Sequence, residues 1–289
     1  NTERGNNYPT FSVLSNPEFL AEGTAINDLL YPDRVLIGGE DAESINALSN
    51  IYKNWVPEEK ILKTNIWSSE LAKLTSNAFL AQRISSINSV AEICEVTGAN
   101  IKEVSKAIGM DHRIGKDFLN SGPGFGGSCF KKDILNLVYL CQYFGLTKVA
   151  RYWESVVELN YWQQDRISKL ITQKLLGNIS SKFILILGFA FKANTNDTRE
   201  SSAIQISLNL LEEGANLLIH DPKVSPKQIT LDLETEESKS LNPESNYNTK
   251  DKGKWKYVSD LSNSFYQIDA VVILTEWEEY KLINWNQVT

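Results

Sequence analysis

In Phe183-Ile184-Leu185-Ile186-Leu187-Gly188, five apolar residues run without a break into a glycine. Such a short apolar run, bounded by a turn residue, is typical of a strand that is buried on both faces of a parallel sheet. A helical pattern follows, Gly214 ends it, and Leu217-Leu218-Ile219-His220 has the pattern of the next strand. The order strand, helix, strand predicts a βαβ unit, and Ala270 to Thr275 adds another buried strand. We therefore predict an open α/β sheet from about residue 182 to residue 289.

One stretch inside this predicted sheet has a different composition. Residues 225–256 are polar and show almost no apolar periodicity. Long segments without such periodicity usually run over the surface of a domain. We therefore interpret residues 225–256 as a mobile surface insertion.

The middle of the chain, from about residue 67 to residue 177, is predicted to be helical. Apolar residues recur every three or four positions from Leu71 to Cys94, so one face of a helix is apolar, and Gly98 ends it. A shorter helix and a glycine-rich loop follow. An unbroken helical pattern then extends from Lys148 to Leu176, which at about 1.5 Å per residue predicts a helix of roughly 40 Å. A helix of this length suits a bridge between domains or an oligomer interface.

The first 65 residues alternate short strand patterns with turn signals. Strands are predicted at Phe11 to Leu14, Arg34 to Ile37 and Lys60 to Thr64. This is the pattern of the end of an α/β layer, because no opening strand and no phosphate-binding turn are present. We therefore expect three domains, at residues 1–65, 66–177 and 178–289.

The composition excludes several classes of protein. The 289 residues include 29 Lys and Arg against 36 Asp and Glu, and the net charge of −7 argues against a general nucleic-acid binder. No apolar run approaches the roughly 20 residues of a membrane-spanning helix, and the polar N-terminus lacks the pattern of a signal peptide. Two His and three Cys without metal-ligand spacing predict no metal site. The few cysteines favour a reducing compartment, so we expect a cytoplasmic protein. Because the chain lacks an initiator Met, we expect a fragment or a processed product.

A glycine-rich loop followed by a cysteine is the most informative motif. It is Gly122-Pro123-Gly124-Phe125-Gly126-Gly127-Ser128-Cys129, and Lys131, Lys132 and Asp133 follow it. The glycines allow backbone N–H groups to approach an anion closely, whereas the pattern of a Walker A loop is absent. A helix N-terminus and nearby cations favour the thiolate, so Cys129 is a candidate nucleophile. The alternative is a flexible turn followed by a small buried cysteine.

Two pairs of polar residues are further candidates. Lys73 and Asn77 are four positions apart on the predicted helix and could stabilise an oxyanion, or they belong to a solvated helix face. Glu18 and Glu22 could serve as a base and a ligand, or they are ordinary acids in the first turn of a helix.

Several cations stand near predicted strand or helix ends. Lys192 follows the strand that ends at Leu187, where ligands bind in open α/β sheets, although the loop lacks a dinucleotide fingerprint. Arg199 precedes the next helix and could bind an anion, or it belongs to a capping run with solvated charges. Arg113 lies between two helices, and a surface salt bridge is its default interpretation.

Six strings together resemble the eukaryotic UDP-glucose 6-dehydrogenases of the UDP-glucose/GDP-mannose dehydrogenase family. Their order and spacing match over nearly the whole chain, except at residues 225–256. The strings are SNPEFLAEGTAI from Ser15, PDRVLIGG from Pro32, KLTSNAFLAQRISSINS from Lys73, GFGGSCFKKD from Gly124, GFAFK from Gly188 and DTRESS from Asp197.

The resemblance implies the fold and the activity. It implies the end of a Rossmann-like NAD domain, a central helical dimerisation domain with a long connecting helix, and a second Rossmann-like domain that binds UDP. It further implies a two-step, NAD-dependent oxidation of the C6 alcohol of UDP-glucose to a carboxylate. By resemblance, Cys129 captures the C6 aldehyde as a thiohemiacetal, which the second oxidation converts to a thioester. Lys73 and Asn77 would stabilise the oxyanions, Asp133 would activate water together with Lys73, and Glu18 would act as acid and base in thioester hydrolysis.

The resemblance also implies the binding residues. The substrate-binding residues would be Glu18, Phe19, Leu20, Ala21, Glu22, Lys73, Asn77, Arg113, Phe118, Asn120, Ser121, Gly122, Pro123, Gly124, Phe125, Gly126, Phe191 and Lys192. The residues near the cofactor would be Glu22, Cys129, Phe130, Lys131, Lys132 and Arg199. Arg113 would reach the substrate site of a neighbouring subunit, so a homo-oligomer, dimeric or larger, is implied.

The chain departs from the family pattern in three places. It lacks the glycine-rich NAD fingerprint and the segment after the last strand, so we expect the chain alone to be inactive. Asn120 stands where a lysine is common in animal members. Two alternatives stay open: a dehydrogenase for another nucleotide sugar, such as GDP-mannose or UDP-N-acetylmannosamine, and a non-catalytic protein that binds nucleotide sugars.

Overall fold

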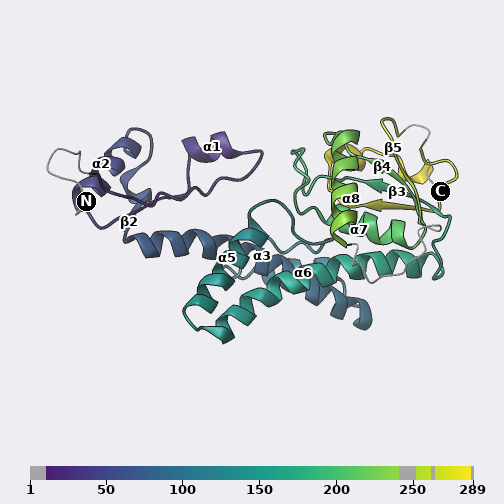
Figure 1. Ribbon diagram of the computed structural model, residues 1–289, viewed down its shortest axis with the longest axis horizontal. Coiled ribbons are helices and arrows are strands. Elements are labelled where there is room, and N and C mark those ends of the chain that lie inside the picture. The colour runs from purple at the N-terminus through teal and green to yellow at the C-terminus, as the bar shows by residue number, and fades with distance from the viewer. Residues whose placement is uncertain (1–10, 241–251, 262–263, 288–289) are drawn as a thin grey trace. The chain divides into compact units, whose positions relative to one another are not determined.

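The structure is a computed structural model that describes residues 11–240, 252–261 and 264–287. The chain divides into two compact units, Asn1–Asn77 and Ala78–Thr289. The boundary lies inside one long helix, α3 (Ile66–Thr97). Figure 1 labels the helices and strands of both units.

From residue 11 on, where the structure describes it, the first unit is built on two parallel strands. Strand β1 (Val35–Gly38) pairs with β2 (Ile61–Thr64), and helix α2 (Ala42–Tyr52) connects them through the 3-10 turn η1 (Glu58–Lys60). The short helix α1 (Ala25–Leu30) precedes β1. The buried side chains of Val35, Ile37, Val56 and Ile61 form the core of this unit.

Two of the three strands predicted here are confirmed, and the strand predicted at Phe11 to Leu14 is wrong. That segment has no regular structure, and only the next residue, Ser15, forms an isolated antiparallel bridge with Gly38. The side chains of Phe11 and Val13 are exposed, so burial does not stabilise an extended pairing of this segment.

Four helices form the helical region. Besides α3, these are α4 (Ile101–Gly109), α5 (Phe130–Tyr143) and α6 (Thr147–Lys174). Within the second unit, Ala78 and Ala81 of α3 pack with Ile134 and Val138 of α5 and with Val156 of α6. The predicted long helix is confirmed: α6 extends from this region to the C-terminal sheet (Figure 1).

In the described part of residues 178–289, the C-terminal sheet has four parallel strands in the order β5-β4-β3-β6. They are β3 (Phe183–Leu187), β4 (Asn216–His220), β5 (Trp255–Tyr257) and β6 (Ala270–Ile273). Helix α7 (Ser202–Glu212) connects β3 to β4, as predicted, and α9 (Glu278–Lys281) and the 3-10 turn η2 (Trp285–Gln287) follow β6. The apolar run that ends at Leu187 is almost completely buried, since both faces of β3 are covered.

The interpretation of residues 225–256 as a surface insertion is wrong for the part that the structure describes. Helix α8 (Pro226–Ser240) and strand β5 lie there, and residues 241–251 are outside the described residues. Ile229 and Leu233, one helical turn apart, are buried in the core of the sheet. Over residues 226–234, the part of α8 whose side chains the structure describes, the buried stripe is narrow, which is why the sequence pattern missed this helix.

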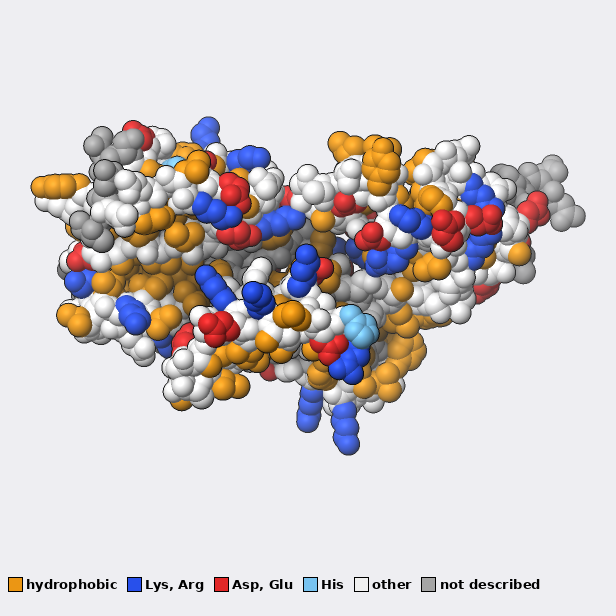
Figure 2. Space-filling model, turned by 180° about the vertical axis from the view of Figure 1, so that it is seen from behind, with side chains coloured by type: hydrophobic (Ala, Val, Ile, Leu, Met, Phe, Trp, Pro, Cys, Tyr) orange, Lys and Arg blue, Asp and Glu red, His pale blue; other side chains and the backbone are white. Residues whose placement is uncertain are grey.

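The surface is mixed in character. On the face drawn in Figure 2, Lys and Arg side chains lie interspersed with Asp and Glu, and hydrophobic side chains are visible among them. Among the described helices, none is long and apolar enough to cross a membrane.

Candidate active site

Cys129 occupies the N-cap position of α5. Its side chain is exposed, and its Sγ lies 3.6 Å from Ser128 Oγ. Asp133, one helical turn later, is buried in the same helix. The prediction of a cysteine at a helix N-terminus is confirmed, and the alternative of a buried cysteine is wrong. Cys94 and Cys141 are the buried ones.

The glycines before Cys129 have a packing role. A Cβ atom on Gly126 would lie 2.6 Å from the Glu200 carbonyl oxygen and 2.8 Å from Phe191 Cβ. A Cβ atom on Gly127 would lie 3.0 Å from the Phe191 ring. The absence of side chains thus lets this loop lie directly against the segments after β3, which places the predicted substrate loop beside Phe191.

The aromatic residues of the loop region contact one another. The Phe130 ring is 5.9 Å from that of Phe125, edge-on, and 6.5 Å from that of Phe118. Phe125 is buried, whereas Phe118, Asn120 and Ser121 are exposed. Phe118 has a φ of 60°, a backbone conformation that is unusual for a bulky residue and that marks a tight turn before the loop.

Lys131 does not lie free beside the thiol. Its Nζ is 2.9 Å from both carboxylate oxygens of Glu200 and 5.2 Å from the centre of the Tyr161 ring. Burial disfavours the charge of Lys131, but hydrogen bonds with Tyr161 and Glu200 outweigh burial and raise its pKa. Lys131 therefore ties α5 to the segment before α7, and Lys132 is the exposed lysine of the two.

A buried carboxylate holds the loop that follows β3. Asp221 Oδ2 accepts hydrogen bonds from Phe189 N at 2.7 Å and from Ala190 N at 3.0 Å. Phe191 and Lys192 follow directly, and Lys192 Nζ lies 5.5 Å from the Phe191 ring centre. Because Asp221 fixes the backbone on which they stand, the predicted ligand residues of this loop have a rigid base. Sequence reasoning missed Asp221, although an acid directly after β4 is a visible signal.

Arg113 and Arg199 share one local arrangement. Each guanidinium forms an ion pair with the aspartate two residues before it, Asp111 and Asp197 respectively, and each arginine side chain is largely exposed. Hydrogen bonds from Arg113 lower the pKa of Asp111, and the same contact raises the pKa of Arg113. The expected surface salt bridge at Arg113 is confirmed. Ser201 caps α7, since its Oγ accepts a hydrogen bond from Ala203 N.

The first unit brings together Glu18, Phe19 and Lys73. Lys73 Nζ is 3.3 Å from Glu18 Oε1 and 5.6 Å from the Phe19 ring centre, and Glu18 Oε2 accepts a hydrogen bond from Leu20 N at 2.8 Å. The Arg34 guanidinium stacks on Phe19 at 3.8 Å, a contact that sequence reasoning missed. Ala21 N donates a hydrogen bond to Asp28.

The acids of this segment do not stand in a helix. Glu18 and Glu22 precede α1, which begins at Ala25, so their alternative interpretation as first-turn acids is wrong. Lys73 and Asn77 do share the helix α3, as predicted.

No metal centre is present in the part of the chain that the structure describes, because no three His, Cys, Asp or Glu side chains are grouped to hold an ion there. A cavity of about 350 Å³ opens between α3 and α6, lined by residues such as Glu92, Trp162 and Lys169. Its lining includes none of the predicted site residues.

Three family models match the chain in sequence order. The NAD binding domain of the UDP-glucose/GDP-mannose dehydrogenase family matches residues 1–56, its central domain matches residues 67–162, and its UDP binding domain matches residues 185–289. This chain belongs to the UDP-glucose/GDP-mannose dehydrogenase family. The resemblance of the six strings and the predicted α/β fold with parallel sheets are therefore confirmed.

Relatives within the UDP-glucose/GDP-mannose dehydrogenase family are similar over almost all of this chain. The chain is 52% identical over 282 residues to the UDP-glucose 6-dehydrogenase of Drosophila melanogaster, covering 96% of this chain and 58% of that protein. It is 49% identical over 287 residues to UDP-glucose 6-dehydrogenase 1 of Glycine max, covering 96% of this chain and 59% of that protein. The chain thus spans less than two thirds of the length of these curated relatives.

A solved structure of the same family agrees with the fold. The UDP-glucose dehydrogenase of Pyrobaculum islandicum is 33% identical, with a TM-score of 0.79 over 95% of this chain and 58% of that one. A UDP-D-ManNAc dehydrogenase of Pyrococcus horikoshii, 24% identical with a TM-score of 0.74, shares the fold.

Proposed function

We propose that this chain contributes the substrate site and the nucleophile of a UDP-glucose 6-dehydrogenase, which oxidises UDP-glucose to UDP-glucuronate. The observation that supports this best is the exposed Cys129 at the start of α5. It directly follows a glycine loop that lies against Phe191, in the region that matches the UDP binding domain. A protein that only binds nucleotide sugars has no use for an exposed thiol at this position.

NAD+, when bound, supplies the hydride acceptor for both oxidations. The donor chemistry of this chain fits an anionic dinucleotide, since Arg199 and Lys132 are exposed cations that would hold its phosphates. Glu22, Phe130 and Lys131 are proposed to stand near the cofactor as well.

Cys129 is proposed to form the covalent intermediate. Its thiolate would add to the carbonyl carbon of the C6 aldehyde, forming a C–S bond and an oxyanion that takes up a proton to give a thiohemiacetal. The second oxidation removes a hydride from C6 and a proton from the hydroxyl, which leaves a thioester. Water would then add to the thioester and the C–S bond would break, which releases the carboxylate and the Cys129 thiolate, while the two protons of the water pass to solvent.

Four other side chains are proposed to assist these steps. Lys73 and Asn77 would stabilise each oxyanion with a cation and an amide donor. Asp133 would orient water together with Lys73. Glu18, which pairs with Lys73 in the first unit, would transfer protons in thioester hydrolysis.

A set of residues is proposed to contact the UDP-sugar. The proposed set is Glu18, Phe19, Leu20, Ala21, Glu22, Lys73, Asn77, Phe118, Asn120, Ser121, Gly122, Pro123, Gly124, Phe125, Gly126, Phe191 and Lys192. Arg113 of a neighbouring subunit would complete it.

A homo-oligomer is proposed as the working form. Aromatic side chains are exposed along α5: Tyr139 stacks on Tyr143 at 6.4 Å, and Phe144 follows at 5.1 Å from Tyr143. Leu146 and Tyr152 extend the exposed apolar surface onto α6. Surfaces of this kind are typical of protein interfaces, which supports the central domain as the dimerisation domain.

We also propose a division of the chain into domains and a cellular compartment. The division into domains at residues 1–65, 66–177 and 178–289 agrees with the order of the family models. Three cysteines without a disulfide suit a reducing compartment such as the cytoplasm.

The experiment that tests the proposal uses a chimera. The Drosophila melanogaster relative supplies the part of its length that this chain does not span, and NADH formation from UDP-glucose and NAD+ is recorded. We expect about two NADH per UDP-glucose consumed, and no turnover in Cys129→Ser, because a hydroxyl is a much weaker nucleophile than a thiolate. UDP-glucose binding should remain near normal in that variant. Wild-type turnover by Cys129→Ser would overturn the assignment of the nucleophile.

A further inference from the structure

The glycine loop is held by side-chain amides. Its backbone has no regular structure between Asn120 and Ser128, so helix or sheet bonds do not satisfy its polar groups. Gly122 N donates to Asn88 Oδ1 at 2.9 Å, and Gln163 Nε2 donates to Gly122 O at 2.8 Å. Asn160 accepts from Phe125 N at 2.8 Å and donates to Phe125 O at 3.0 Å. We call Asn88, Asn160 and Gln163 the amide clamp.

The three amides of the clamp are buried at 1%, 6% and 2% exposure respectively. They come from two different helices, Asn88 from α3 and the other two from successive turns of α6. Asn88 Nδ2 has no hydrogen-bond partner among the described residues. A buried donor without a partner costs free energy. The hydrogen bond from Gly122 N to Asn88 Oδ1 offsets this cost and explains why an amide side chain occupies the position.

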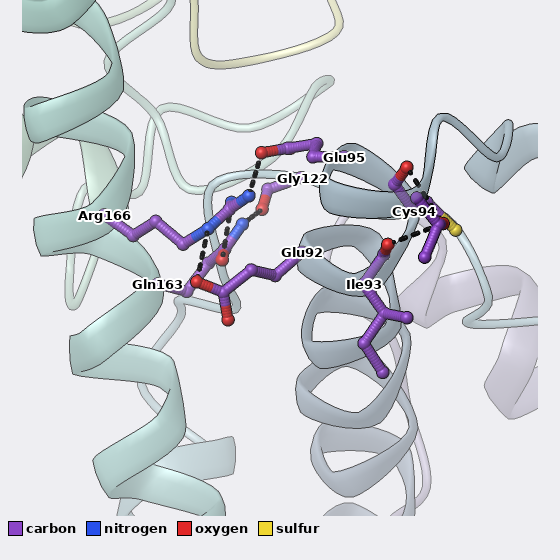
Figure 3. A network of polar contacts seen from close by, with 8 residues as sticks. Glu92, Ile93, Cys94, Glu95, Gly122, Gln163 and Arg166 are labelled. Carbon is purple, nitrogen blue, oxygen red and sulfur yellow. Dashed lines mark hydrogen bonds and ion pairs between the residues drawn. The ribbon is translucent and has the colours of Figure 1, made fainter.

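A second set of charged side chains stands behind Gln163. Arg166 Nη1 donates to Gln163 Oε1 at 3.5 Å, and the guanidinium also pairs with Glu92 at 3.7 Å and with Glu95. Figure 3 shows Arg166 between the two carboxylates of α3 and Gln163, with the Gln163 amide directed to Gly122. The Arg166 side chain is only 13% exposed. The guanidinium therefore orients the Gln163 amide so that its NH₂ group faces the loop.

Directional bonds of this kind do more than fill space. Apolar side chains of similar size would pack the same volume without fixing the backbone, whereas the clamp fixes both polar atoms of Gly122 and of Phe125. The loop runs from these two residues directly into Cys129. A change of the loop backbone would thus move the groups that precede the thiol.

We propose that Asn88, Asn160 and Gln163, with Arg166 behind Gln163, are positioning residues that set the glycine loop in the conformation that binds the UDP-sugar and presents Cys129. The inference rests on the proposed function for the identity of the ligand. The conformation of the loop itself can be tested without any ligand, so the two claims can fail separately.

The test compares Gln163→Met with Gln164→Met in the 289-residue chain. Gln164 is the matched control, because it is the neighbouring amide of α6, is equally buried at 4% exposure, and bonds to Ser202 Oγ at 3.2 Å rather than to the loop backbone. Hydrogen–deuterium exchange of residues 120–128, the Kd for UDP-glucose by calorimetry, and the melting temperature are measured for both variants. Arg166→Met is the milder second variant in case Gln163→Met does not fold.

We expect Gln163→Met to speed exchange of the loop and to weaken UDP-glucose binding, each by about tenfold, which corresponds to the loss of one hydrogen bond. Arg166→Met should also raise the exchange rate of the loop and the Kd for UDP-glucose, each by about threefold. Gln164→Met should lower the melting temperature but leave loop exchange and Kd within about twofold of wild type. Equal effects of the two glutamine variants on loop exchange and Kd would overturn the inference, and so would unchanged loop exchange in Gln163→Met. If the wild-type chain does not bind UDP-glucose, the proposed function fails, and the exchange comparison alone decides whether the clamp sets the loop.

Discussion

Cys129 and Cys141 belong to the same helical segment and have opposite environments. Cys141 is buried in the core of the helical region, where it packs like a small apolar residue. Cys129 is exposed at the N-cap, ahead of the first turn of α5. The backbone N–H groups of that turn point toward the thiol end of the helix and favour negative charge there. The two residues are of the same type, so their positions in the helix determine that Cys129 is the candidate nucleophile and that Cys141 is a core residue.

His220 predicts a pH dependence of stability. It is buried at the end of β4, where its Nδ1 lies 2.9 Å from the Tyr280 hydroxyl. Burial lowers the pKa of His220 below its ordinary value of 6.5, although nearby carboxylates of Glu279, Asp221 and Asp260 act in the opposite direction. The folded chain thus binds this proton less readily than the unfolded chain. The contribution of His220 to stability is complete above pH 6.5 and is lost as the pH falls below that value.

We expect the melting temperature to fall between about pH 7.5 and about pH 5.5, and to fall less in His220→Phe. The variant keeps a ring of similar size, and the Tyr280 hydroxyl can still donate to the backbone oxygen of residue 220. Carboxyl groups with lowered pKa values, such as those of Asp41, Asp111 and Asp269, lose their contribution only near or below pH 3.8. These carboxyl groups therefore do not contribute to the change in melting temperature between about pH 7.5 and about pH 5.5. Identical pH dependence of the two proteins by scanning calorimetry would exclude this role of His220.

At the scale of elements, the contact between the glycine loop and the segments after β3 depends on missing side chains. Gly126→Ala should destabilise the chain by about 1–3 kcal/mol, since the new methyl group meets the Glu200 carbonyl at 2.6 Å. Gly122→Ala is the matched control in the same loop. Its added methyl group meets no atom within 4 Å, so we expect a change within about 0.5 kcal/mol. Urea denaturation measures the unfolding free energy of both variants. An equal decrease in the two variants would contradict the packing role of Gly126.

Helix α8 is an integral part of the C-terminal domain rather than a surface insertion. Ile229 is completely buried, and Leu231, two residues later, is 58% exposed. Ile229→Ala should therefore cost about 2–5 kcal/mol of unfolding free energy. Leu231→Ala should cost less than about 0.5 kcal/mol. If both variants unfold at the wild-type urea concentration, α8 does not pack as described.

These elements also show how far the sequence could be interpreted. Continuous apolar runs such as that ending at Leu187 and the regular spacing in α3 and α6 predicted the elements correctly, because burial repeats at the period of the backbone. Helix α8 was missed because, among its described side chains at residues 226–234, the buried stripe is narrow. The exposed segment at Phe11 resembled a strand but has no ladder partner in the described residues.

Some features of the candidate site could be predicted from local sequence, whereas contacts between residues far apart in the chain could not. Cys129 could be placed at a helix start from local sequence alone. The pairing of Lys131 with Glu200 joins residues 69 positions apart, and the clamp residues Asn160 and Gln163 bond a loop 35 and 41 positions away. Local patterns contain no information about such distant partners, so these contacts required the structure.

For the whole molecule, the proposed function requires that UDP-glucose bind beside Cys129. Cys94 and Cys141 are buried, so they are internal references for the accessibility of a thiol in the folded chain. Without ligand, iodoacetamide should therefore alkylate Cys129 first, and peptide mass spectrometry distinguishes the three sites.

The most direct measurement is the rate of Cys129 alkylation with and without UDP-glucose, with GDP-mannose as the control ligand. At a concentration about ten times its Kd, a ligand leaves only about one tenth of the sites free, so we predict that UDP-glucose slows the alkylation of Cys129 about tenfold. GDP-mannose at the same concentration should leave the rate nearly unchanged. An alkylation rate that UDP-glucose does not change, or that GDP-mannose lowers equally, would contradict specific binding of UDP-glucose beside Cys129.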